Sequence, residues 1–283
     1  MRIVRIALIA AFILSLGIFG VTEAVQLAGS DSNVPVITSD REVLEILCEY
    51  TEEQLLEGLT AEDGTDGDLT SQIIPGTFSR FIADGICEMT YVVFDSDNQP
   101  GTLTRKVSFT DYHPPRFTLS EPLVFTVQEG SYSAAMSRIG AQDMLDGDLT
   151  GWVTQTDTDL NYDSAGTYTM TVQVSNSFGD TSTVALPVHV VSGDSPLEIR
   201  LTTPIVYLTP GDTIDPDTYV EDVFDAEGSS LATGVVSASS EVESDTPGCY
   251  EIHYTADDGN GNTGETWLTV VVEETRGGES DES

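Results

Sequence analysis

Apolar and polar residues alternate with a period of two in long parts of the chain. In "YTMTVQV" (168–174) every second residue is hydrophobic, and "YEIHYTA" (250–256) follows the same rule. This period is typical of a β-strand with one buried face. A polar turn rich in Gly, Asn and Asp and then another apolar segment follow each of these strands, which predicts a β-hairpin near the end of each repeated unit.

Shorter strands are predicted around these hairpins. Early strands are expected in "RFTL" (116–119) and "PLVFTV" (122–127), and a middle strand in "GWVTQT" (151–156). No segment has a convincing amphipathic helical pattern, although "EEQLLEGLTAED" (52–63) is expected to form a short helical turn or a strand. Short strands separated by frequent turn residues indicate an all-β sandwich.

Two blocks of sequence recur along the chain. The first is "AEDGTDGDLT" (61–70), then "AQDMLDGDLT" (141–150), and a degraded copy within 220–231 in which Asp222 and Asp225 are matched to the first two aspartates. The second block occupies 85–101, 166–182 and 248–264. We therefore predict three tandem β-sandwich domains after an N-terminal hydrophobic helix. The predicted segments are a signal or anchor at 1–24, a linker at 25–33, domains at 34–111, 112–192 and 193–274, and an acidic tail at 275–283.

This arrangement resembles a bacterial immunoglobulin-like repeat known from pesticidal crystal proteins and bacterial surface proteins, which is similar to the hyalin repeat. The second unit matches the pattern best, at Asp143, Asp146, Gly147, Asp148, Leu149, Gly166 and Tyr168. The first unit departs at Cys87, where tyrosine is usual, and the third at Ala226 and Glu227. The resemblance implies a β-sandwich module in a surface or secreted protein, used as a spacer or adhesive part without catalysis of its own.

The N-terminus indicates export. Two arginines precede an uncharged run from Ile6 to Val21, and "TEA" follows it. This order is that of a secretory signal peptide, with cleavage after Ala24. The same run, left uncleaved, would serve as a membrane anchor with its arginines in the cytoplasm. Both alternatives place residues 25–283 outside the cytoplasm, and contact with the membrane is expected only through this segment.

The charge of the chain narrows the classes of partner. There are 48 acidic residues against 10 basic ones, which gives a formal net charge of −38. A surface this negative repels nucleic-acid phosphates and anionic lipid headgroups, so we expect no nucleic-acid partner. Proteins or carbohydrates at the cell surface are the partners that remain.

The recurring aspartates allow two interpretations. Clustered carboxylate oxygens suit a hard cation, so calcium is the ion that these turns would bind, although no cofactor is required. The alternative is structural, because an Asp side chain accepts hydrogen bonds from backbone N–H groups two residues on and can cap a short helical turn. The calcium candidates are Asp63, Asp66, Asp68, Asp143, Asp146, Asp148, Asp222 and Asp225.

Catalytic chemistry is not indicated. The three histidines, His113, His189 and His253, fall at different points of their units and form no visible triad or zinc cluster. The chain carries no Gly-rich phosphate loop and no nucleophile elbow. We therefore expect no enzymatic activity.

The three cysteines lead to one structural prediction. Cys48 and Cys87 both lie in the first unit, so a disulfide between them is expected in an exported domain, and two buried thiols are the alternative. Cys249 would stay unpaired in both cases.

Two functions from different classes follow. The first is a non-catalytic surface or secreted protein whose modules act as stalk, scaffold or adhesion module, with short Pro-containing connections that favour a semi-rigid rod. The second is a calcium-dependent module that binds carbohydrate or protein. The second function would need exposed aromatic side chains, but Trp152 and Trp267 lie within strand patterns and are expected in the core.

Overall fold

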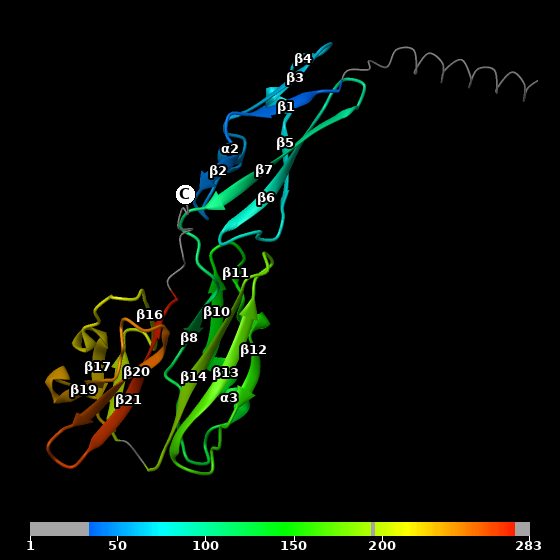
Figure 1. The fold of residues 1–283 in the computed structure, drawn as a ribbon. Helices are drawn as coiled ribbons and strands as arrows, with labels where there is room; N and C mark the ends of the chain where they lie inside the picture. Colours follow the sequence, from blue (N-terminus) through cyan, green and yellow to red (C-terminus); the bar gives the residue numbers. More distant parts are fainter. Residues whose placement is uncertain (1–33, 194–195, 275–283) are drawn as a thin grey trace, which may run out of the picture. The chain divides into compact units, whose positions relative to one another are not determined.

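A computed structural model describes residues 34–193 and 196–274 of the chain (Figure 1). It divides into two compact units, of which the first ends at Thr110 and the second begins at Asp111. The first unit holds one β-sandwich repeat and the second holds two. The N-terminal signal or anchor, the linker at 25–33 and the acidic tail lie outside the described residues. Within the described ranges, no helix is long and apolar enough to cross a membrane.

The first repeat consists of two sheets. One sheet has the order β1-β3-β4 and the other β2-β7-β6-β5. Its elements are β1 (Val36–Ser39), β2 (Val43–Ile46), α2 (Glu52–Leu55), β3 (Leu59–Asp63), β4 (Gly67–Asp68), the 3-10 turn η1 (Thr70–Gln72), β5 (Ile74–Phe78), β6 (Ile86–Phe94) and β7 (Pro100–Phe109). The segment 52–63 thus forms both a helical turn and a strand.

The second repeat has the same plan, with sheets β11-β10-β8 and β12-β13-β14-β9. Its elements are β8 (Arg116–Leu119), β9 (Val124–Thr126), α3 (Tyr132–Arg138), β10 (Ile139–Asp143), β11 (Gly147–Asp148), η2 (Thr150–Trp152), β12 (Thr154–Thr158), β13 (Gly166–Ser175) and β14 (Thr181–Val191). The pattern analysis did not anticipate α3, whose seven residues bury only Ala135 and so carry little periodic signal.

The third repeat again has a three-stranded sheet, β15-β17-β18, and a four-stranded sheet, β16-β21-β20-β19. Its elements are β15 (Glu198–Leu201), β16 (Ile205–Leu208), η3 (Pro216–Tyr219), β17 (Val220–Phe224), β18 (Ser230–Leu231), η4 (Thr233–Val235), β19 (Val236–Ser240), β20 (Gly248–Asp257) and β21 (Thr263–Val272). The all-β prediction with repeated two-sheet units is confirmed.

One connection defines the topology of all three repeats. The second strand of each repeat joins the four-stranded sheet and pairs parallel with the last strand, as β2 does with β7, β9 with β14 and β16 with β21. The other strand pairs are antiparallel. The chain therefore contributes to both sheets within its first dozen residues of each repeat, which ties the two sheets together at one edge.

The predicted hairpins form the centre of each core. In β13 the alternating residues Met170, Val172 and Val174 are buried, with at most 1% of each side chain exposed. In β20 the equivalent residues Ile252 and Tyr254 are fully buried. Burial of every second side chain is the property that the period of two predicts.

A tyrosine near the start of the first hairpin strand fixes the preceding loop in two repeats. The hydroxyl of Tyr168 donates to the carbonyl oxygen of Ser164 at 2.9 Å, and that of Tyr250 donates to Thr246 at 3.0 Å. This bond to backbone a few residues upstream is also found in immunoglobulin-like sandwiches. The first repeat has Cys87 at this position and therefore lacks the bond.

The second and third repeats pack against each other within their unit. Tyr207, Cys249 and Val271 of the third repeat pack against the apolar cluster of the second. The Tyr207 side chain also accepts a hydrogen bond from the backbone N–H of Phe117 at 2.7 Å. These contacts hold the second and third repeats together in one compact unit, so the two are not loosely linked.

Candidate functional site

The aspartate turn of the first repeat connects β3 to β4. Oδ1 of Asp63 accepts hydrogen bonds from the backbone N–H groups of Thr65 at 2.8 Å and Asp66 at 2.9 Å. Oδ1 of Asp68 accepts from the N–H of Thr70, the first residue of η1, at 2.9 Å. These carboxylates therefore satisfy donors of their own turn.

The second repeat repeats this geometry closely. Oδ1 of Asp143 accepts from the backbone N–H groups of Leu145 and Asp146, both at 2.9 Å. Oδ1 of Asp148 accepts from the N–H of Thr150 at 2.9 Å. The expected Asx-type bonds to N–H groups two residues on are confirmed in both copies. The expected helix cap is wrong, because Leu69 and Leu149 stand at the N-cap positions of η1 and η2 and neither turn has a side-chain cap bond.

The turns also explain two other features of the motif. Gly67 and Gly147 have φ angles of +74° and +73°, a left-handed conformation that residues with a Cβ rarely adopt. The N–H donors of the turn hold the pKa of Asp63 below its ordinary value. The hydroxyl and N–H of the threonine two residues on lower the pKa of Asp68 and of Asp148 in the same way. These three groups are therefore ionised at neutral pH.

The middle aspartate of each motif reaches a second loop. The carboxylate of Asp66 accepts from the hydroxyl of Ser96 at 2.9 Å and also from its backbone N–H. Asp146 accepts from the hydroxyl of Ser177 at 2.8 Å and from its N–H. The aspartate turn and the hairpin loop after it in sequence thus lie side by side in these two repeats.

The third copy has a different register from the one matched in sequence. The strand pairing of β17 with β18 places Asp225, and not Asp222, at the position of Asp63. Oδ1 of Asp225 accepts from the N–H groups of Glu227 at 3.0 Å and Ser229 at 2.8 Å. The sequence-based alignment is therefore wrong by three residues, because it matched acidic residues by spacing whereas the apolar positions of the strands set the pairing.

The aspartates of these turns are also the candidate calcium ligands. In residues 34–193 and 196–274, no three or more His, Cys, Asp or Glu side chains are grouped as they would be around a metal ion. The first and last aspartates of each turn in the first two repeats accept from backbone donors of their own turn through Oδ1. A calcium role for them stays a prediction.

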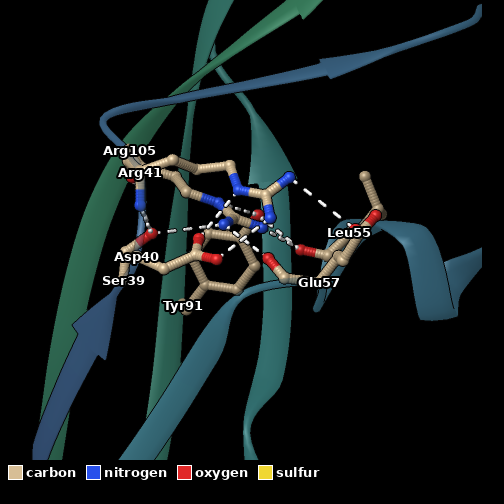
Figure 2. A network of polar contacts seen from close by, with 7 residues as sticks. All are labelled: Ser39, Asp40, Arg41, Leu55, Glu57, Tyr91 and Arg105. Atoms are coloured by element: carbon tan, nitrogen blue, oxygen red, sulfur yellow. Dashed lines mark hydrogen bonds and ion pairs between the residues drawn. The ribbon is translucent and has the colours of Figure 1, made fainter.

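A buried arginine, absent from the sequence-based candidates, organises the first repeat (Figure 2). Arg105 on β7 is 4% exposed. Its guanidinium donates to the carbonyl oxygens of Leu55 at 2.6 Å and Glu57 at 2.8 Å, and to the hydroxyl of Tyr91 at 3.2 Å. The Tyr91 hydroxyl itself donates to the Leu55 carbonyl at 2.8 Å. One side chain thus holds the segment between α2 and β3 against the sheet.

An ion pair lies beside this network. Asp40 and Arg41 form a two-pronged contact with N–O distances of 2.7 and 3.0 Å. The Arg41 bond lowers the pKa of Asp40, and the charge of Arg105 adds to this effect. A groove of about 530 Å³ opens here, and its walls include Glu42 and Lys106 as well as Arg41. Side chains of both signs line the groove, so it favours no class of ion.

The position of Arg105 could have been noticed from the repeats. Strand pairing aligns it with Leu186 in β14 and Leu268 in β21, both fully buried. A charged residue at an inward position that is leucine in both other copies signals a polar network.

The cysteines of the first repeat are both buried, and the structure holds Cys48 and Cys87 as thiols. The disulfide between them stays a prediction for the oxidised protein. Cys249 is half-buried against the second repeat. Burial raises the pKa of Cys87 and that of Cys249 to about 12.

The two tryptophans have different surroundings. Trp267 is half-buried and stacks between His189 and His253, which confirms that it is no exposed platform. Trp152, in contrast, is 72% exposed. The expectation of a core position for Trp152 is wrong, because 150–152 forms the 3-10 turn η2 and the strand β12 begins only at Thr154.

The chain is similar to known proteins only in part of its sequence. No protein-family model matches the chain. An uncharacterized 81.3 kDa protein of Acholeplasma phage L2 is 31% identical over 135 residues, which cover 47% of this chain and 18% of the phage protein. The chain thus spans less than a fifth of that relative.

Solved structures similar to the chain are multi-domain proteins with low scores. One contains the M60 catalytic domain with the CBM51-1 and CBM51-2 domains from Clostridium perfringens ZmpB, at 14% identity, covering 86% of this chain and 31% of that chain with a TM-score of 0.24. Another is Drosophila N-cadherin EC1-3, at 10% identity, covering 87% and 91% with a TM-score of 0.30. Scores this low carry no conclusion about ligands or activity.

Proposed function

We propose that this chain is a non-catalytic extracytoplasmic protein, secreted or held at the membrane by its N-terminal hydrophobic segment. Its tandem immunoglobulin-like modules, of the bacterial surface-protein type, would act as stalk, scaffold or adhesion module. The observation that carries this proposal is that the recurring aspartates accept hydrogen bonds from the backbone of their own turns. In the first two repeats, Asp63 and Asp143 accept the same pair of N–H groups in their turns.

The same hydrogen bonds recur in the aspartate turns of the first two repeats, which supports a structural role for these aspartates. A catalytic carboxylate needs an oxygen directed at substrate, with a pKa adjusted toward the working pH. Asp68 and Asp148 instead have lowered pKa values because they accept bonds from the threonine that follows. Groups of this kind maintain loop geometry, which a load-carrying or adhesive module requires.

Export is the part of this proposal that an experiment tests most directly. The full chain, tagged at its C-terminus and expressed in a bacterial host, should be digested by protease added outside intact cells or be recovered from the medium. A variant with Leu8→Arg and Ile13→Arg in the hydrophobic run should remain inside and protected. Protection of the unmodified chain in intact cells would contradict the proposal.

A specific observation favours a second candidate function, binding of carbohydrate or protein. Trp152 exposes 72% of its surface at the end of η2. Tryptophan is enriched at interfaces because it buries a large apolar area while ordering few torsions. An exposed indole on a rigid turn is therefore a suitable contact for a sugar ring or a protein side chain, with or without calcium.

A pair of variants tests this second function. The full chain would be screened on a glycan array, and Trp152→Ala should weaken any hit about tenfold or more, which corresponds to 1.4 kcal/mol. Tyr132→Ala is the matched control, because Tyr132 is a 53% exposed aromatic residue of the same repeat. Equal losses in both variants, or none in either, would argue against a Trp152 site. Repeating the measurement with a chelator separates calcium-dependent from calcium-independent binding.

A further inference from the structure

The first residue of the hairpin loop is equivalent in all three repeats. Asp95, Asn176 and Asp258 each donate their backbone N–H to the carbonyl oxygen four residues on, at 3.2, 3.0 and 3.2 Å. Oδ1 of each side chain accepts the N–H of that same residue, at 2.7, 2.9 and 3.2 Å. The side chain at this position is therefore held by the same two bonds in each loop, and the repeats differ in its second polar atom.

In the second repeat this second atom is an amide nitrogen. Nδ2 of Asn176 donates to Oδ2 of Asp143 at 3.1 Å and to the hydroxyl of Tyr112 at 2.8 Å. Asn176 and Asp143 are 7% and 6% exposed. The buried carboxylate of Asp143 thus has both oxygens satisfied, one by its turn and the other by the loop.

In the third repeat the second atom is a carboxylate oxygen with its own donors. Oδ2 of Asp258 accepts from the side-chain amides of Asn262 at 2.7 Å and Asn260 at 3.3 Å. The loop itself therefore supplies the donors that stabilise the carboxylate at this position.

In the first repeat the second atom is also a carboxylate oxygen, and the equivalence of the loops directs it toward Asp63 as Nδ2 of Asn176 is directed toward Asp143. Asp95 occupies the place of Asn176, so its outer oxygen replaces the amide that Asp143 receives. Asp63, the equivalent of Asp143, is 8% exposed, as is Asp95. Oδ2 of Asp63 is enclosed and accepts no hydrogen bond from the described part of the chain. The equivalence with the second repeat therefore brings two buried carboxylates together, and the described residues supply no donor for Oδ2 of Asp63.

A positive charge or a proton between the oxygens would stabilise such a pair. A buried polar atom without a partner is costly, and two like charges at close range raise that cost. Backbone donors lower the pKa of Asp63, which opposes protonation. A small cation with affinity for oxygen ligands supplies the missing charge.

We propose that Asp63 and Asp95 of the first repeat bind a divalent hard cation of the calcium class, which the second repeat replaces with the amide of Asn176. Calcium takes six to eight oxygen ligands, so water and backbone oxygens complete the shell. Because only two carboxylates contribute, the affinity is in the range of about 10⁻⁴–10⁻³ M that extracellular calcium modules show.

The test uses the full chain and calcium chloride from 0.1 to 10 mM, compared with sodium chloride at matched ionic strength. Amide hydrogen exchange of 59–68 and 94–99 is measured by mass spectrometry. For a Kd of about 1 mM, 10 mM calcium should slow exchange through local opening roughly tenfold. The equivalent segments of the second repeat, 139–148 and 175–180, should not respond.

Asp95→Asn is the decisive variant, because it places in the first repeat the residue that the second repeat already has. It should abolish the calcium effect and slow exchange in calcium-free buffer. Asp63→Asn is a second variant that retains an acceptor for the turn, and it should also abolish the effect. Glu62→Gln is the matched control, since Glu62 is an exposed neighbour with the same charge change, and it should respond as the unmodified chain does.

Three results would overturn the proposal. One is no calcium protection in 59–68 and 94–99, or equal protection by sodium chloride, which would mean general screening of acidic charge. Another is a full calcium response in Asp95→Asn. The third is calcium-free protection that appears on acidification alone, because the pair would then share a proton.

Discussion

The indole ring of Trp267 lies flat on the imidazole ring of His189, with 3.8 Å between the ring centroids and 8° between the ring planes. His189 belongs to β14 of the second repeat and Trp267 to β21 of the third, so this contact joins two repeats. The opposite face of the indole stacks on His253 at 4.4 Å. Nε2 of His189 also contacts a carboxylate oxygen of Glu251, across the same boundary, at 2.8 Å.

We predict that Trp267→Ala destabilises the second unit by about 2 kcal/mol, because two ring contacts worth roughly 0.5–1.5 kcal/mol each are lost. Urea unfolding followed by circular dichroism measures this change. Trp152→Ala is the control, and it should change the free energy of unfolding by less than about 0.5 kcal/mol because the side chain is largely exposed. Similar losses in the two variants would contradict a stabilising role for the stack.

The first unit should depend on Arg105. Arg105→Ala removes donors from the buried carbonyl oxygen of Leu55 and from that of Glu57, and it leaves the Tyr91 hydroxyl without this donor, so we expect a loss of about 3 kcal/mol. Arg105→Lys should lose nearly as much, since a single ammonium does not reproduce the fork that reaches both carbonyls. Lys106→Ala, at the exposed neighbour, should have little effect. Urea unfolding monitored by tyrosine fluorescence checks all three, and a stable Arg105→Lys would show that charge alone suffices.

Whether a feature of this protein can be predicted from its sequence depends on whether it is set by local residues or by a neighbouring element. The inward residues of the hairpins, such as Val172 and Ile252, are buried in every copy, so their period is visible without a structure. The turns at Asp63 and Asp143 were equally readable, because Asp-Gly chemistry is local. Features that depend on a neighbouring element were not.

Trp152, Arg105 and Asp95 illustrate the second group. Trp152 follows a strand-like pattern, yet the turn η2 directs its ring outward. Arg105 is tolerated in a core because carbonyls of a distant segment face it. Asp95 looks like an ordinary loop residue, and its burial follows only from the packing of two loops that Ser96 and Asp66, thirty residues apart in sequence, hold together.

Acid should weaken the aspartate turns. Asp148 has a folded-state pKa below its unfolded value, so its contribution to stability is present above about pH 4 and is lost as the pH falls through the lower folded pKa. Asp148→Asn keeps an acceptor for Thr150 but cannot titrate. Its free energy of unfolding should therefore fall less between pH 5 and pH 2 than that of the unmodified chain. An unchanged slope would contradict this assignment, and Asp163→Asn serves as an exposed control in the same repeat.

Thiol reactivity should be low in the folded protein. The pKa of Cys87 and of Cys249 is raised to about 12 from 9.0, which lowers the thiolate fraction roughly 1000-fold. Iodoacetamide at pH 8 should therefore modify these residues slowly until urea is added, as mass spectrometry would show. Rapid native labelling would contradict their burial. The same experiment without reductant tests the Cys48–Cys87 disulfide, because three alkylated cysteines after unfolding would exclude it.

The reciprocal exchange in the second repeat tests the logic of the buried pair. Asn176→Asp removes the amide that donates to Asp143 and to the hydroxyl of Tyr112, and it adds a charge opposite a carboxylate. We expect the second unit to lose about 3 kcal/mol in calcium-free buffer, since an uncompensated buried charge is costly.

Both tryptophans lie in this second unit, so their fluorescence during urea unfolding reports the loss. Asn161→Asp is the matched control, because Asn161 is exposed and an aspartate there retains the acceptor for the N–H of Asp163. Calcium should restore part of the stability lost in Asn176→Asp but none in Asn161→Asp. If Asn176→Asp is as stable as the unmodified chain without calcium, then facing carboxylates are tolerated in this loop and the first repeat has no need of a cation.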